Sequence, residues 1–234
     1  MKNQTDLVIL ILSSKDNKER RQAQRDTWLK NIHIPYRFIL GIPFESLESD
    51  SLWVNAEDTD LPEKLLIAYK TCLRKFDFKH IFTCDDDTYV VVDRLLNCGY
   101  EEHMYMGNKY TFKEGAREGK SHAEGGGGFF LSREAIERIT QVPLDHELID
   151  GPSDTAIGDL AKMYSIKLYN DNRFVQGYST KKRHGELPTP LNNVITSHYL
   201  DAKLFHKVHS QFSHAFWSER LAKDLKVSQA KSII

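Results

Sequence analysis

Residues 80–92 read His-Ile-Phe-Thr-Cys-Asp-Asp-Asp-Thr-Tyr-Val-Val-Val, and this stretch decides which fold the chain can adopt. Residues 80–84 have the composition of a buried strand, and a second apolar run follows the aspartates at residues 89–92. Three adjacent carboxylates separate the two runs. Like charges at this spacing raise one another's pKa and destabilise a fold unless a positive charge lies among them. The triplet is therefore predicted to be a polar island within a buried segment.

A divalent metal ion is one neutraliser that fits such a triplet. Oxygen ligands suit Mg²⁺ or Mn²⁺, which usually take one or two carboxylates and complete their shell with water and substrate phosphates. Because side chains alternate along extended backbone, we expect Asp85 and Asp87 to point one way and Asp86 the other. The alternative is a solvated acidic turn that caps the next segment. The apolar runs on both sides of the triplet favour a site.

Strand and helix patterns alternate before the triplet. Residues 7–12 form a continuous apolar run, typical of a strand that is covered on both faces. A polar helix is expected over 18–29, a second strand over 36–41, and an amphipathic helix from Pro62. This alternation predicts an α/β fold with a mostly parallel central sheet. Ligands bind at the carboxyl ends of the strands in such sheets, so Ser13 is expected to lie beside the triplet.

Shorter elements are expected after the triplet. A strand is predicted near 104–108, and residues 113–124 have the composition of a polar loop. Four glycines at 125–128 then lead into an apolar strand. Because glycines cost backbone entropy, this run implies a close approach, such as a sugar against bare backbone, or a flexible loop. Helices are expected over 132–139, 152–164, 201–209 and 214–225.

Composition narrows the class of protein. The 234 residues suit one domain, and 32 Lys and Arg against 33 Asp and Glu argue against a general nucleic-acid binder. Three cysteines, an odd number, indicate buried thiols and not a disulfide scaffold. The longest apolar run is far shorter than the roughly 20 residues that span a bilayer, and no signal-peptide pattern is visible. We therefore expect a cytoplasmic protein, or one whose targeting segment has been removed, with at most peripheral membrane contact.

Four motifs follow one another between residues 20 and 158. They are Arg-Arg-Gln-Ala-Gln-Arg-Asp-Thr-Trp at 20–28, Asp-Asp-Asp-Thr-Tyr-Val at 85–90, Gly-Gly-Gly-Gly-Phe-Phe-Leu-Ser at 125–132 and Pro-Ser-Asp-Thr-Ala-Ile-Gly at 152–158. In this order they resemble the motifs of glycosyltransferase family 31, the group that contains Fringe and the β-1,3-galactosyl- and N-acetylglucosaminyltransferases. The second motif resembles the family's DxD metal motif. The chain departs from the family at Ser153-Asp154, where two acids are usual.

The resemblance implies a GT-A fold, in which a Rossmann-like nucleotide-binding half is joined to an acceptor-binding half. The expected halves are residues 1–108 and 109–200 of a single domain, followed by C-terminal helices over 201–234. The implied activity is inverting transfer of a hexose or N-acetylhexosamine from a UDP-sugar to a hydroxyl of a glycan or glycoconjugate acceptor. Mn²⁺ is the implied cofactor, with Mg²⁺ as the alternative, and a β-1,3 linkage is the expected product. The sequence does not distinguish among UDP-sugars or acceptors.

The resemblance also implies where the protein acts. Family members in eukaryotes are usually anchored in the Golgi. The absence of an anchor in this sequence therefore suggests a bacterial or viral soluble enzyme, or a trimmed Golgi-lumenal catalytic domain.

Residue roles are carried over where the motifs match. Asp87 is expected to be a direct metal ligand and His198 the second, with His184 as the other candidate histidine. Asp85 is expected near the ribose or the metal's water shell. Asp154 is the implied general base, and a position in the first turn of a helix would keep it ionised; read without the other motifs, it is an ordinary helix-start residue. The residues expected to contact the UDP-sugar are Ser13, Arg25, Asp85, Asp86, Gly126 and Gly127.

Two other functions fit parts of the sequence. The first is a relative of the same fold that has lost catalysis and acts as a binding or chaperone module. The presence of Asp87 and Asp154 at matching positions argues against it. The second is a phosphoryl-transfer enzyme or nuclease that uses the triplet for two metals. That chemistry needs more clustered carboxylates, and the chain has neither a phosphate loop nor a basic excess.

Overall fold

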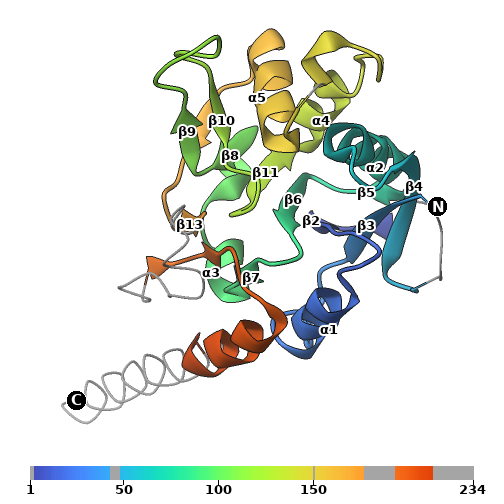
Figure 1. The fold of residues 1–234 in the computed structure, drawn as a ribbon, viewed down its shortest axis with the longest axis vertical. Coiled ribbons are helices and arrows are strands. Elements are labelled where there is room, and N and C mark those ends of the chain that lie inside the picture. The colour runs from blue at the N-terminus through green and yellow to red at the C-terminus, as the bar shows by residue number, and fades with distance from the viewer. Residues whose placement is uncertain (1–2, 43–47, 150, 177–192, 213–234) are drawn as a thin grey trace, which may run out of the picture.

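A seven-stranded sheet is the largest sheet among the described residues, which are 3–42, 48–149, 151–176 and 193–212 of this computed structural model (Figure 1). Its strand order is β12-β8-β11-β6-β2-β3-β4. Only β11 runs antiparallel to its neighbours, so the predicted α/β fold with a mostly parallel sheet is confirmed. The strands are β2 (Leu7–Leu12), β3 (Tyr36–Ile42), β4 (Ser51–Glu57), β6 (His80–Asp85), β8 (Tyr105–Gly107), β11 (Phe129–Ser132) and β12 (Leu168–Asn170).

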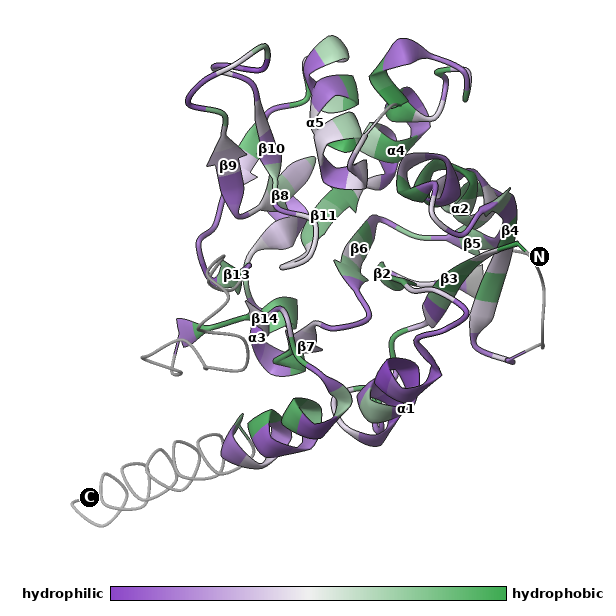
Figure 2. Cartoon of the chain, in the orientation of Figure 1, coloured by the Kyte–Doolittle hydropathy of each residue, from purple (hydrophilic) through white to green (hydrophobic). Residues whose placement is uncertain are grey.

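Strand β2 explains why the sheet is covered on both faces. All of its residues are buried, and their side chains alternate between two separate hydrophobic clusters. Val8, Leu10 and Leu12 join the cluster under α2 (Leu61–Lys75), α4 (Arg133–Ile139) and α5 (Ser153–Met163). Leu7, Ile9 and Ile11 join the cluster under α1 (Lys18–Asp26), α3 (Val92–Leu96) and the helical residues 202–212. Apart from the residues that join this cluster, α1 is mostly hydrophilic (Figure 2).

The longer helices begin where local chemistry predicts. Asp60 caps α2 by accepting a hydrogen bond from the Glu63 amide at 3.1 Å, and Pro62 lies in the first turn. Ser132 caps α4 in the same way through the Ala135 amide. Pro152 precedes α5, as expected for a residue that cannot donate from its backbone.

Smaller sheets complete the fold. β9 (Lys109–Thr111) and β10 (Ser121–Ala123) form a hairpin, and β1 (Asn3–Gln4) pairs with β5 (Phe76–Asp77). β13 (Phe174–Val175), β14 (Thr196–Ser197) and β7 (Tyr89–Val90) form a three-stranded sheet. Two short 3₁₀ helices span Tyr100–Glu102 and Glu147–Ile149. The pairing of β14 with β7 brings the segment before His198 to the segment after the triplet.

Two sequence expectations were wrong. Residues 113–124 are not all loop, because 121–123 form β10, and no strand was expected where β4 lies. β4 is an edge strand whose buried Leu52, Val54 and Ala56 alternate with more exposed residues, so the period-2 signal was present but short. The expected helix at 214–225 lies outside the described residues. Within the described ranges, no helix has the length and apolar character needed to cross a membrane.

Replacing Leu10 by alanine tests the double cover of β2. Leu10 is 0% exposed, so Leu10→Ala should lower the free energy of unfolding by about 2–5 kcal/mol, measured by urea denaturation. Leu96→Ala is the control, because Leu96 is 38% exposed and its loss should stay within about 1 kcal/mol. Equal losses in the two variants would contradict a core built around β2.

Candidate functional site

The carboxyl ends of β2 and β6 meet at one edge of the sheet. Leu12 pairs with Asp85, and the Asp86 amide donates to the Leu12 carbonyl at 2.9 Å. Ser13 then donates from its hydroxyl to Oδ2 of Asp86 at 2.7 Å. The structure thus brings Ser13 and the aspartate triplet together.

The three aspartates face two ways. Nε2 of His198 lies 2.8 Å from Oδ1 of Asp87 and 3.6 Å from Oδ2 of Asp85. Asp86 points away from this group and contacts Ser13 and Arg20. Ligand atoms of Asp85, Asp87 and His198 all lie within 4.8 Å of one another, which makes a possible metal site. Asp85 and Asp87 share a direction as expected, but the cause is a turn and not extended backbone, because β6 ends at Asp85 and the Thr88 amide donates to the Asp85 carbonyl at 3.2 Å.

The hydrogen bond on the other side of the His198 ring suits a metal ligand. Nδ1 lies 3.1 Å from the carbonyl oxygen of Gln176, which can only accept, so Nδ1 carries the proton. In the neutral ring Nε2 then presents a lone pair to two carboxylates. Such an arrangement needs either a cation between these groups or an additional proton on the ring or on a carboxylate. The donor set of two carboxylates and one imidazole therefore fits a divalent cation.

Without a cation, the cluster retains protons near neutral pH. Desolvation, assisted by the charges of Asp87 and Asp86, raises the pKa of Asp85 to about 7. Burial lowers the pKa of His198, but its interaction with Asp87 and the charge of Asp85 outweigh burial and leave that pKa above its usual value. A cation that binds here must displace those protons.

The glycine run lies against the site's own side chains. A Cβ at Gly126 would lie 2.0 Å from Cε1 of His198, and a Cβ at Gly125 would lie 2.9 Å from the Cβ of Asp154. Gly128 adopts φ of 93°, a left-handed conformation that favours glycine. The expected close approach is therefore present, and the groups that approach are His198 and Asp154. Whether a sugar also lies here stays a prediction.

Asp154 stands in the first turn of α5 and faces this glycine turn. Its Oδ2 accepts from the Gly125 amide at 3.0 Å and lies 3.6 Å from Nε2 of His122. Its Oδ1 accepts from the Thr155 amide at 2.7 Å. The side chain is 21% exposed, so a small hydroxyl can reach the carboxylate from solvent. Adjacent glycines thus place Asp154 and His198 on the same turn.

Arg25 is the predicted residue that the structure does not bring to this edge. It pairs with Glu48 and Asp50 and lies over the Phe38 ring. Arg20 takes the position beside the triplet, with Nη1 3.3 Å from Asp86 and 3.5 Å from Asp87.

The helical spacing of the sequence indicates which residues of α1 lie together beside the triplet. Arg20 and Gln24 are four residues apart, and the Gln24 amide donates to the carbonyls of Asp85 and Thr88. Arg21 and Arg25, also four residues apart, both pair with Glu48, and the sequence alone does not tell which face of the helix meets the triplet.

Gln176 and Glu124 also escaped the sequence analysis. Gln176 holds His198 through its carbonyl, and its side-chain oxygen accepts from the Gly127 amide at 2.6 Å. Glu124 precedes the glycine run and accepts from the Asn108 side chain at 2.6 Å. Burial raises its pKa, helped by the charge of Asp154. His184 lies outside the described residues.

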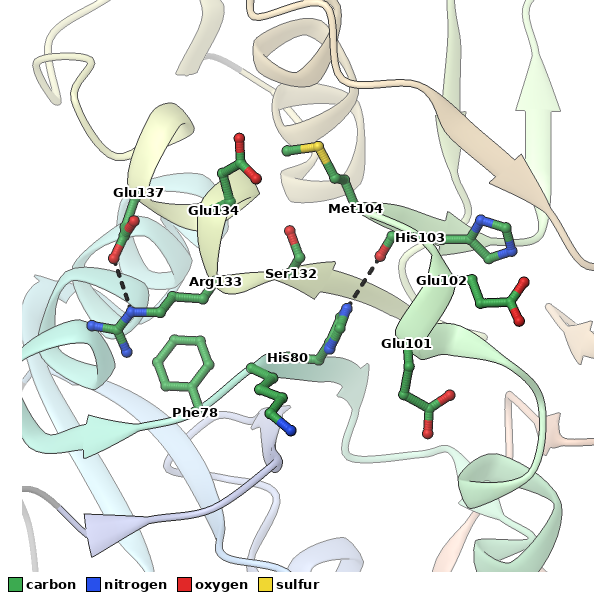
Figure 3. A pocket seen from close by; sticks show the side chains of 11 residues that line it. Phe78, His80, Glu101, Glu102, His103, Met104, Ser132, Arg133, Glu134 and Glu137 are labelled. Atoms are coloured by element: carbon green, nitrogen blue, oxygen red, sulfur yellow. Dashed lines mark hydrogen bonds and ion pairs between the residues drawn. The ribbon is translucent and has the colours of Figure 1, made fainter.

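Two hollows differ in their relation to these residues. One of about 190 Å³ is lined by Ser13, Arg20, Asp58 and the triplet. A larger one of about 480 Å³ lies at the other end of β6, beside His80 and Arg133 (Figure 3). Arg133 pairs there with Glu137 and His80 contacts the His103 carbonyl, and the hollow contains none of the predicted site residues. The smaller hollow therefore belongs to the candidate site.

The mostly parallel central sheet and the similarity to solved glycosyltransferase structures show a GT-A fold, as predicted. The chain is similar in fold to a glycosyltransferase involved in the glycosylation of the major capsid of PBCV-1, with a TM-score of 0.50 and 13% identity over 87% of this chain and 100% of that one. No family model matches the chain.

A curated relative carries the comparison further. The chain is 28% identical over 154 residues to glycoprotein-N-acetylgalactosamine 3-beta-galactosyltransferase 1 of Xenopus laevis. The match covers 58% of this chain and 39% of the relative, so the chain spans about two fifths of that protein's length. This relative is a β-1,3-galactosyltransferase, and the resemblance to glycosyltransferase family 31 is confirmed.

Proton release tests the electrostatics of the cluster. Mn²⁺ should bind at least about tenfold more tightly at about pH 8 than at about pH 6, because acid protonates Asp85 and His198 before a cation can reach them. Titration calorimetry in two buffers of different ionisation enthalpy measures the protons released. Asp77→Asn, on β5 before the start of β6, should leave the release unchanged. Binding without proton release would contradict the assignment.

Proposed function

We propose that this chain is an inverting glycosyltransferase that moves a hexose or N-acetylhexosamine from a UDP-sugar to a hydroxyl of a glycan or glycoconjugate, with Mn²⁺ as cofactor and a β-1,3 linkage as product. The observation that carries the proposal is the cluster of Asp85, Asp87 and His198, separated from Asp154 by one glycine turn. The similarity to a β-1,3-galactosyltransferase supports the same class of reaction. The division into halves near residue 108 is part of this proposal.

Asp87 and His198 would hold the metal directly. Asp85, whose side chain is 38% exposed, would contact its water shell or the ribose. When bound, the cation supplies Lewis-acid stabilisation of the charge that develops on the leaving diphosphate. The hydrogen bond from Nδ1 of His198 to Gln176 keeps the Nε2 lone pair directed at that position.

The donor would lie at the carboxyl edge. Ser13 and Asp86 line the hollow there. Gly126 and Gly127 would approach the sugar from the connection between β10 and β11. Arg20 is 39% exposed and pairs weakly with Asp86 and Asp87, so it can turn toward phosphate oxygens. Arg25 would first have to leave Glu48 and Asp50, which makes Arg20 the better candidate for this contact.

Asp154 would be the general base. As the bond between the anomeric carbon and the UDP oxygen breaks, the acceptor oxygen bonds to that carbon from the opposite face and passes its proton to the carboxylate. The carboxylate stands in the first turn of α5 and accepts hydrogen bonds from the Gly125 and Thr155 amides, which hold it beside the glycine turn. A catalytically inactive relative is the alternative, and donor turnover separates the two.

Thermal stability with UDP, with and without Mn²⁺, tests the donor site. A ligand at a hundred times its dissociation constant should add about 2.7 kcal/mol to the stability of the folded protein. Stabilisation should require UDP and Mn²⁺ together. It should disappear in Asp87→Asn, which removes a charged ligand, and persist in the control Asp77→Asn. Full stabilisation of Asp87→Asn would rule out Asp87 as a ligand, and no stabilisation of the wild type would leave only a shared fold.

Replacing the proposed base tests catalysis separately from binding. Asp154→Asn should retain stabilisation by UDP and Mn²⁺ but lose roughly a hundredfold or more in turnover, measured as release of UDP from a panel of UDP-sugars. Asp145→Asn, on an exposed loop before α5, is the matched control and should keep wild-type turnover. Normal turnover of Asp154→Asn would mean that another group removes the proton.

A further inference from the structure

The β9–β10 hairpin presses a buried histidine against the start of α5. His122, on β10, is only 7% exposed, and the rings of Tyr110 and Phe112 lie 5.5 and 5.3 Å from its own. Its Nε2 points to α5 and lies 3.6 Å from Oδ2 of Asp154. An imidazole with aromatic walls thus directs a nitrogen toward the proposed base.

Gly158 makes this approach possible. It stands one helical turn after Asp154, so the two residues share a face of α5. A Cβ at Gly158 would lie 2.5 Å from the Cβ of His122 and 3.0 Å from its Cα. Since backbone cannot yield as a flexible side chain can, only glycine lets β10 come this close. The glycine that ends the fourth sequence motif therefore gives His122 its place.

The charges around His122 leave Asp154 as its partner. Asp159, the other carboxylate facing it from α5, pairs with Arg117 at 2.7 Å and with Lys120 at 3.6 Å. Asp154 has no such cation among the described residues, and besides His122 it receives hydrogen bonds from Gly125 and Thr155. Burial lowers the pKa of His122, with Arg117 adding to the shift and Asp154 and Asp159 opposing it. A neutral imidazole can donate from Nε2 without neutralising the carboxylate.

We propose that His122 is a positioning residue that holds Oδ2 of Asp154 against the Gly125 amide and so fixes the direction of the carboxylate. The role rests on the proposed function, because Asp154 is the base of that reaction. The separation of 3.6 Å exceeds a direct hydrogen bond, and such contacts shorten when substrate occupies a site. A shortened contact would place Oδ2 between two donors, the Gly125 amide and His122, and would keep the carboxylate from turning away from an acceptor hydroxyl.

Two substitutions separate positioning from packing. His122→Phe keeps the ring volume but removes the donor, whereas His122→Gln keeps a donor on a smaller side chain. Turnover of His122→Phe should fall by about tenfold to a hundredfold with an unchanged KM for the UDP-sugar, and His122→Gln should recover part of that loss. Tyr110→Phe removes only a hydroxyl beside the same ring and should behave as wild type. Stabilisation by UDP and Mn²⁺ reports whether each variant is folded.

A second measurement does not depend on turnover. Nuclear magnetic resonance titration should show that Asp154→Asn lowers the pKa of His122, because the carboxylate favours the charged ring. Asp145→Asn should leave it unchanged. An unchanged pKa of His122 in Asp154→Asn would overturn the pairing.

The two proposals can fail separately. An active wild type with an equally active His122→Phe would overturn the positioning role and leave the proposed function intact. A wild type without turnover on any UDP-sugar would overturn the proposed function, and the positioning role with it.

Discussion

The parallel pairing of β2 with β6 is the interaction on which the rest of the structure depends. Both strands are buried, so their backbone groups must bond to each other, and the register sets Leu12 opposite Asp85. The strands end together, and the first polar residues beyond them, Ser13 and Asp86, then bond across the gap. The acidic triplet, which would be costly inside the sheet, therefore lies at its edge, where the Asp85 side chain is partly exposed and Arg20 pairs with Asp86 and Asp87.

Much of this arrangement could be predicted from the sequence, because strong local patterns specified it. The apolar run of β2 and the residues before the triplet have the length and composition of buried strands. The caps at Asp60 and Ser132 set where helices begin. β4 was missed because an edge strand is buried on alternate positions only. β10 was missed because its polar residues pair with a hairpin partner that composition does not reveal.

The candidate site was predictable in its residue types but not in its supports. The order of the motifs in the sequence pointed to Asp85, Asp87, Asp154 and His198. In the structure these residues lie close together. The partners that orient them come from elsewhere in the chain. Gln176 contacts His198 through a backbone carbonyl, which no side-chain motif records. The choice of Arg20 over Arg25 depends on the rotation of α1 about its axis, and periodicity leaves that rotation open.

The adjacency of Gly125 and Gly126 has a mechanical consequence. One peptide unit joins the residue that touches Asp154 to the residue that touches the His198 ring. A rotation of that unit moves both contacts, so the separation between Asp154, the proposed base, and His198, the proposed metal ligand, is set over a few bond lengths. Along the chain, Asp154 and His198 are separated by α5, β13 and β14, whereas the glycine turn connects them directly. The spacing of two side chains that are distant in sequence thus depends on the geometry of one short turn.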